Sequence, residues 1–378
     1  MKKHIVLAAA GISLCASVFA QSITLTNTFG GNTNSTCGSD TGGEDFITFS
    51  KDDDDTYSNT QAHVSDRLQL DFSSKKFDGR LRTEIKTGKL TDPEPEIKLT
   101  GYVRFRPIEQ LGFAAGNSFF TKYVVSSAFL AAANDYPSYG KMADNGFAVI
   151  SNIGGLTLAG NISGDSIFNN NESFKLNFGA QYAIPDAVSF GATFRSVTNG
   201  NFSTGVFAGL ECVKNLILNV GFIYNSTETK FAYEPSKYTL QASAGYTIPS
   251  AKLGFYADVA TGLNNEYLSP KKDADGKITD YETMEHKDGS DDYVPLQARA
   301  RLVFDVTDTI ALNGDVKVRT KIGADETETT VYPYINIKLD KFGTLDAGIR
   351  MRFTNGDGLA SFSIPLAWKC KLVDKKFN

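Results

Sequence analysis

The chain has 378 residues, a formal charge of −5, 41% hydrophobic residues and only three histidines. The hydrophobic content is too low for a bundle of membrane-spanning helices, and the negative charge argues against a nucleic-acid-binding protein, whose surface should be basic. The length allows two or three soluble domains, or a single large all-β barrel.

The first twenty residues have the features of a secretory signal peptide. Lys2 and Lys3 precede an apolar stretch over residues 5–18, and small or short residues follow up to Ala20. We therefore expect cleavage after Ala20, which removes both lysines and lowers the formal charge from −5 to −7. Lipid attachment at Cys15 is an alternative, but a bulky leucine precedes this cysteine where a small residue is needed.

Alternation of apolar and polar residues recurs along the rest of the chain. In residues 77–86 the odd positions are apolar or small, apart from one threonine, and every even position is charged. Side chains alternate between the two faces of a strand, so such a run has one apolar face and one charged face. Similar runs cover 97–106, 174–184, 238–248, 296–305, 345–353 and 362–370.

The connections between these runs alternate in length. Short turns are expected near 73–76, 107–110, 151–154, 185–187, 211–215, 249–252, 307–309 and 340–343. Longer loops are expected near 30–62, 87–95, 119–145, 164–172, 197–201, 225–237, 261–292, 322–329 and 354–358. Turns on one side and loops on the other are typical of outer-membrane barrels.

Eight turns and nine loops join eighteen strands and place both termini on the short-turn, periplasmic side. We therefore predict an all-β fold, an antiparallel up-and-down transmembrane β-barrel occupying residues 21–378. Weak patterning near 110–118 and 144–151 leaves sixteen strands as an alternative. A soluble β-sandwich or β-solenoid is the competing fold, but it does not need alternating loop lengths.

The charged faces of five predicted strands would line a water-filled interior, since barrels of sixteen to eighteen strands enclose a channel. These faces carry thirteen basic and six acidic residues. A positive lining should favour anions, although pairing with carboxylates that stiffens the wall is an alternative role. The predicted pore-lining residues are Arg80, Arg82, Lys98, Arg104, Arg106, Arg299, Arg301, Lys317, Arg319, Arg350 and Arg352.

This architecture resembles the porin family of outer-membrane channels over the whole mature chain, although no sequence motif carries the resemblance. It implies passive diffusion of small polar solutes, with lipid around the barrel and a homotrimer as one possible assembly. The connection 119–145 occupies the place where porins fold a loop inward. By that similarity Asp135 and Tyr136 would face the arginines at a constriction, with an exposed surface loop as the alternative.

The other sequence patterns give weaker indications of function than the alternation does. Segment 271–282 resembles a calcium-binding loop, but Lys271 stands at the first ligand position and would repel the cation. His63 and His286 lie in or beside loops without a nucleophile motif, so neither an enzyme, a metal nor a cofactor is expected. The alternative function is an adhesin or structural barrel whose loops at 30–62 and 261–292 bind host molecules.

Overall fold

The computed structural model describes residues 21–30, 47–51, 56–62, 64–86, 95–117, 145–163, 175–195, 202–225, 230–231, 234–235, 238–263, 267–272, 278–284, 294–323, 326–355 and 358–376. The predicted signal peptide lies outside these residues, as do Asp135 and Tyr136. Among the described residues, no helix is both long enough and apolar enough to cross a membrane.

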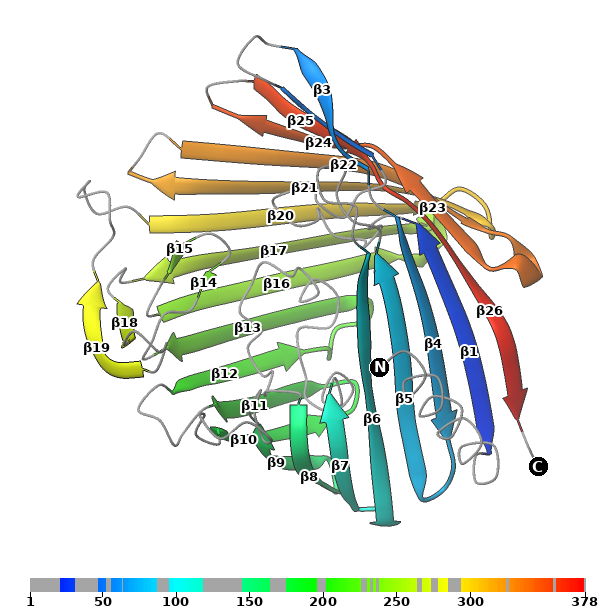
Figure 1. The fold of residues 1–378 in the computed structure, drawn as a ribbon, viewed down its shortest axis with the longest axis vertical. Helices are drawn as coiled ribbons and strands as arrows, with labels where there is room; N and C mark the ends of the chain where they lie inside the picture. The colour runs from blue at the N-terminus through cyan, green and yellow to red at the C-terminus, as the bar shows by residue number, and fades with distance from the viewer. Residues whose placement is uncertain are drawn as a thin grey trace.

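The described strands form one closed antiparallel barrel of eighteen strands (Figure 1). Sixteen wall positions are single strands: β1 (Ser22–Gly30), β4 (Ser65–Ser73), β5 (Phe77–Lys86), β6 (Glu96–Ile108), β7 (Leu111–Asn117), β8 (Asn145–Ile153), β9 (Leu156–Ser163), β10 (Lys175–Ile184), β11 (Val188–Arg195), β12 (Ser203–Leu210), β13 (Leu216–Asn225), β16 (Tyr238–Ile248), β17 (Leu253–Leu263), β20 (Val294–Asp305), β21 (Ile310–Ile322) and β22 (Glu326–Lys338). Two more are interrupted strands: β23 (Thr344–Gly348) with β24 (Arg350–Thr354), and β25 (Gly358–Ile364) with β26 (Leu366–Lys376).

The barrel closes at β1, which pairs with β4 on one side and with β26 on the other. Ser22 lies opposite both Ser73 and Lys376, so the first and last strands end together on the short-turn side. Figure 1 shows blue β1 beside red β26. The predicted fold class is confirmed. The weakly patterned segments form β7 and β8, so the sixteen-strand alternative is wrong.

Some segments that were predicted to be loops form strands in the structure. β2 (Ile47–Lys51) pairs with both β25 and β3 (Tyr57–Ala62), and so extends the wall beyond β1 and β4. Two hairpins outside the main sheet lie in the other long connections: β14 (Lys230–Phe231) with β15 (Glu234–Pro235), and β18 (Tyr267–Lys272) with β19 (Ile278–Met284). The calcium-loop-like segment belongs to the second hairpin, with residues 273–277 outside the described part.

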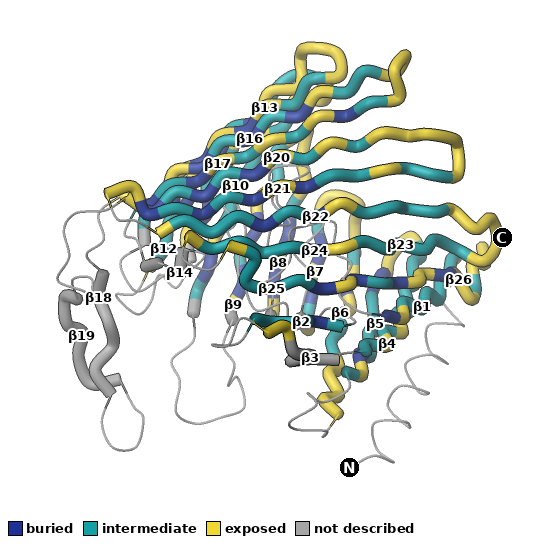
Figure 2. The backbone as a smooth tube through the Cα atoms, turned by 90° about the horizontal axis from the view of Figure 1, so that it is seen from above, coloured by how far each residue is buried: buried dark blue, intermediate teal, exposed yellow. Residues whose placement is uncertain are grey.

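Burial across the wall is the reverse of that in a soluble protein. Along strands such as β12 and β16, buried positions alternate with more exposed ones (Figure 2). The exposed positions are apolar, such as Phe178 and Val206, whereas buried positions include Asn177 and Arg299. Because the wall is a single closed layer, its outward face is apolar and its inward face is polar, as a barrel in lipid requires.

Aromatic rings gather near both ends of the outward face. Phe77 stacks on Phe105 at the short-turn end, with ring centroids 4.9 Å apart. At the loop end, Tyr224 contacts Tyr238 at 5.4 Å. Such girdles mark the two interfaces of a membrane-spanning barrel.

The short turns are built on residues with left-handed backbone conformation. Gly154 and Gly155 form a two-residue turn between β8 and β9, with φ angles of 54° and 88°. A turn with positive φ at both positions matches the twist of the two strands that it joins. A Cβ atom at Gly155 would lie 2.6 Å from the Ala183 carbonyl oxygen, whereas one at Gly154 would meet nothing within 4 Å.

We therefore expect Gly155→Ala to destabilise the barrel by roughly 1–3 kcal/mol, because it combines backbone strain with a steric clash. Gly154→Asn is the matched control, since asparagine accepts this φ and the space is open. The free energy of unfolding in urea, measured in detergent micelles, compares the two variants. Equal stability of both would contradict this account of the turn.

Candidate functional site

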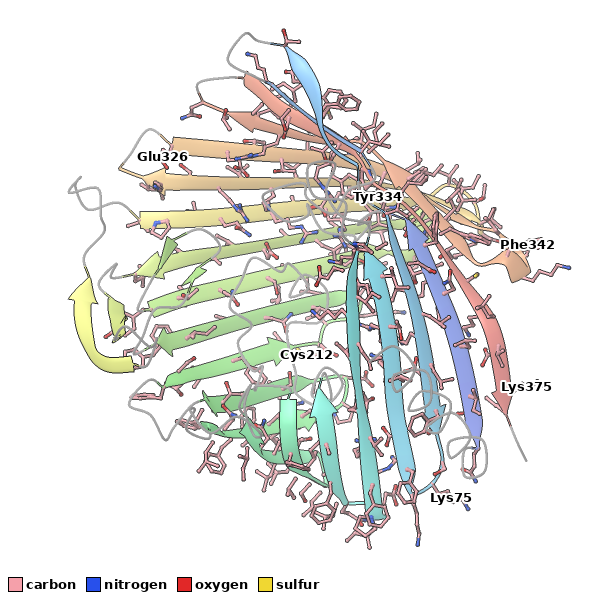
Figure 3. All side chains as sticks on the ribbon, viewed as in Figure 1. Lys75, Cys212, Glu326, Tyr334, Phe342 and Lys375 are labelled. Carbon is pink, nitrogen blue, oxygen red and sulfur yellow. The ribbon has the colours of Figure 1, made fainter. Side chains whose placement is uncertain are left out.

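The inner wall carries two groups of charged side chains, which lie on neighbouring sectors of the barrel. The first group projects from β4, β5 and β6, and the second from β20, β21, β22 and β24. Among the described strands, the interrupted strand of β25 and β26 and the strand β1 lie between them, with β2 and β3 beside β25. Figure 3 shows the polar side chains following these strands.

In the first group each of two carboxylates serves two basic residues. Asp78 binds Arg104 at 2.8 Å and Arg106 at 3.4 Å, and it is buried together with Arg104. Glu84 lies 3.0 Å from Arg67 and 3.8 Å from Lys86. Register explains these contacts, because Asp78 lies opposite Arg104 and Glu84 opposite Arg67 in the paired strands.

Two further arginines of this group have other partners. Arg80 forms a one-to-one ion pair with Asp71 of β4 at 2.7 Å. Arg82 donates two hydrogen bonds to the side-chain oxygen of Gln69, at 2.7 and 3.0 Å. The hydrogen bonds of Arg82 thus fix its position without adding a negative charge.

The second group repeats the shared arrangement. Asp315 of β21 has no exposed surface and lies between Arg299 and Arg301 of β20, with hydrogen bonds of 2.8 Å to each. Glu328 of β22 binds Arg352 at 2.7 Å and lies 3.8 Å from Arg319. One carboxylate again serves two bases, so the side chains named here carry one more positive than negative charge in each such cluster.

Aromatic and lysine side chains complete this sector. The guanidinium of Arg350 lies 4.7 Å from the ring centre of Tyr332, close enough for a cation–π contact. Tyr332 itself stacks against Tyr334. Lys317 is buried, and Lys321 pairs with Glu326 at 2.8 Å.

The opposite arc of the inner wall, from β7 to β17, differs in character. Among its described inward side chains the one charged group is Asp258. The rest are small or neutral, including Ala114, Ala148, Asn177 and Gln241. The charged sector therefore faces an arc whose described inward side chains are almost all neutral.

Alternation in the sequence predicted all eleven basic positions on the polar faces, and the structure brings ten of them into the two groups described above. Lys98 also belongs to the first sector, opposite Glu84 in the register, but its side chain is exposed. Arg67 and Asp71 on β4 and Glu328 on β22 were not predicted from the sequence. The alternation in 65–73 could have found the first two.

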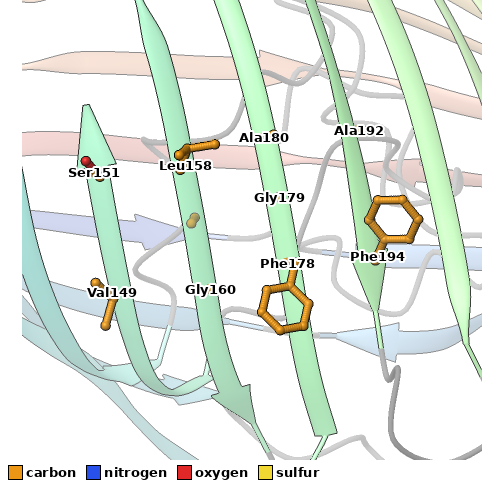
Figure 4. A pocket seen from close by; sticks show the side chains of 10 residues that line it. Val149, Ser151, Leu158, Gly160, Phe178, Gly179, Ala180, Ala192 and Phe194 are labelled. Atoms are coloured by element: carbon orange, nitrogen blue, oxygen red, sulfur yellow. The ribbon is translucent and has the colours of Figure 1, made fainter. Parts of the chain in front are cut away.

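One hollow in the wall, of about 450 Å³, is separate from this site (Figure 4). Its lining is almost entirely apolar, and its large side chains are exposed outward-facing residues of β8 to β11. It therefore belongs to the outward surface and not to the barrel interior. It is lined by Val149, Ser151, Leu158, Ala159, Gly160, Phe178, Gly179, Ala180, Ala192 and Phe194.

Within the described ranges, no group of three or more histidine, cysteine or acidic residues is placed to hold a metal ion. His63 and His286 lie outside those ranges.

No protein family model and no curated protein sequence matches the chain. Solved structures do match. A BenF-like porin from Pseudomonas fluorescens is 11% identical, with a TM-score of 0.56 over 93% of this chain and 98% of that one. The outer membrane protein OprD from Pseudomonas aeruginosa is 11% identical, with a TM-score of 0.57 over 94% of each chain. OccK9 (OpdG) from the same organism is 10% identical, with a TM-score of 0.58 over 93% and 98%.

These likenesses concern the fold. The chain has a porin-like outer-membrane β-barrel fold of eighteen antiparallel strands, as its alternation and loop lengths predicted.

The buried triad around Asp315 predicts a stability difference within the wall. Asp315→Asn removes the carboxylate that binds buried Arg299 and partly buried Arg301, and breaking such a buried pair costs about 3–5 kcal/mol. Asp71→Asn, the control, breaks a pair that is partly exposed to solvent, which should cost about 1 kcal/mol or less. Urea unfolding in micelles, followed through the single tryptophan, measures both. Equal losses would show that Asp315 is not the main counter-charge.

Proposed function

We propose that this chain is an outer-membrane channel for the passive diffusion of small polar solutes, with a preference for anions. The solutes pass through the barrel interior, and the eleven predicted basic residues line their path. The precursor is exported, its signal peptide is cleaved after Ala20, and the short turns face the periplasm. Homotrimeric assembly is part of this proposal.

The observation that carries the anion preference is the sharing of carboxylates. Asp78, Glu84, Asp315 and Glu328 each bind two basic side chains, so pairing among the described residues leaves more positive than negative charge in each cluster. The two roles considered from the sequence, a positive lining and a paired wall, are therefore compatible. A positive wall lowers the energy of an anion in the interior and raises that of a cation.

The anion preference is tested by reversal potentials in planar bilayers under a salt gradient. Arg82→Gln removes a positive charge whose hydrogen-bond partner among the described residues is the neutral Gln69, and we expect the anion-to-cation permeability ratio to fall about twofold to fivefold. Asp78→Asn removes a shared counter-charge and should raise the ratio by a similar factor. Both changes act through the same field, so they must have opposite signs.

Lys252→Gln on the β16–β17 turn is the control, because this exposed lysine pairs with Asp308 outside the barrel interior. It should leave the ratio unchanged. Cation selectivity of the wild-type channel, or equal shifts from all three variants, would defeat the anion preference. Absence of any single-channel conductance would instead favour the adhesin alternative.

A further inference from the structure

Lysines are distributed unevenly over the short-turn rim of the barrel. Five exposed lysines lie on three neighbouring elements: Lys75 and Lys76 in the β4–β5 turn, Lys341 in the β22–β23 turn, and Lys375 and Lys376 at the end of β26. We call these five residues the basic corner. Asp340 is the one acidic residue in the two turns, and Asp374 on β26 is paired with Lys371 at 2.8 Å.

The pairing of the strands places four of these lysines at one stretch of the rim, and the fifth, Lys341, beside the middle of β26, where Thr344 lies opposite Lys369. Ser22 of β1 lies between Ser73, which precedes the β4–β5 turn, and Lys376. On the other side of β26, Trp368 donates a 2.6 Å hydrogen bond to the carbonyl oxygen of Phe342 in the β22–β23 turn. Figure 3 shows Phe342, Lys375 and Lys75 along one edge of the barrel.

The remaining six turns of the rim have the opposite charge balance. They hold two lysines, Lys214 and Lys252, against four carboxylates, and Lys252 is paired with Asp308. The positive charge is therefore confined to one sector of the rim and is not a general property of the turns. The four carboxylates are Glu109, Asp186, Glu211 and Asp308.

The basic corner lies beside the aromatic girdle that marks the membrane interface at the short-turn end. Phe342 is 60% exposed and Lys341 lies 5.3 Å from its ring centre, while Phe77 and Phe105 stack next to the β4–β5 turn. Aromatic rings occupy the headgroup level of a bilayer, so lysines next to them lie where lipid phosphates are found.

We propose that the basic corner binds the headgroups of anionic phospholipids in the periplasmic leaflet. This inference rests on the proposed membrane location, because the lipid must surround the barrel. The chemistry required is that of a phosphodiester whose negative charge is not balanced within its own headgroup, such as phosphatidylglycerol. Lysines at an anionic membrane surface increase binding by about fivefold for each residue.

The chain carries its own reporter for this site. Trp368 is the single tryptophan, it is exposed on the outward face, and it contacts the β22–β23 turn. Bromine atoms on a lipid acyl chain quench nearby tryptophan fluorescence. The full-length mature protein is reconstituted in vesicles of phosphatidylcholine mixed with brominated phosphatidylglycerol, or with brominated phosphatidylcholine. We expect stronger quenching by the brominated phosphatidylglycerol.

Lysine substitutions test whether the lipid preference depends on the basic corner. Lys341→Gln combined with Lys375→Gln should remove the preference for phosphatidylglycerol, whereas Lys214→Gln combined with Lys252→Gln changes the net charge equally and should keep it. A second reporter protein, Trp368→Phe with Phe304→Trp, moves the tryptophan to the β20 end of the girdle, where it should show no preference.

The outcomes are distinguishable. Quenching of Trp368 by neither brominated lipid would refute the membrane location and with it the proposed function. Equal quenching by both lipids, with the barrel inserted, would overturn the lipid site alone. A third outcome is that the wild-type protein binds soluble polyglutamate, loses this binding in the Lys341 and Lys375 double variant, and shows no preference between the two lipids. This outcome would assign the corner to an acidic protein segment and overturn the lipid proposal.

Discussion

The structure depends on one constraint: a sheet surrounded by lipid can leave no backbone N–H or C=O group unpaired. Only closure meets this requirement for strands, and here β1 closes the sheet by pairing with both β4 and β26. Closure separates an outside from an inside, and the period of two along each strand then assigns every side chain to one of them. The apolar exposed belt and the charged interior are two results of the same closure.

A charged interior creates a second requirement, because arginines enclosed by a protein wall need counter-charges. One-to-one pairing would meet it but would leave the wall neutral. Here Asp315 serves two arginines from a position without exposed surface, and Asp78 does the same for Arg104 and Arg106. Sharing thus provides counter-charge for buried arginines while the described side chains of these clusters keep an excess of positive charge.

Much of the fold could be predicted from the sequence, because strand periodicity and turn residues act locally. The alternating run 77–86 has the same bounds as β5, and all eight short turns were located to within a few residues. The partner choices could not be predicted in the same way. Glu328 binds Arg352, 24 residues away, through a register that only strand pairing defines. β2 and β3 were missed because they lie inside a long polar connection.

The neutral arc also takes part in placing the charges. A Cβ atom at Gly112 of β7 would lie 3.3 Å from Cδ of Arg104 and 3.6 Å from Cγ of Arg106. The absence of a side chain there lets both arginines lie against the wall, where they reach Asp78 on β5. Larger side chains at this edge would push the guanidinium groups toward the barrel axis and away from their carboxylate. The small residues next to the charged sector are therefore as much a part of the site as the arginines. They determine whether the guanidinium groups lie along the wall or project into the interior.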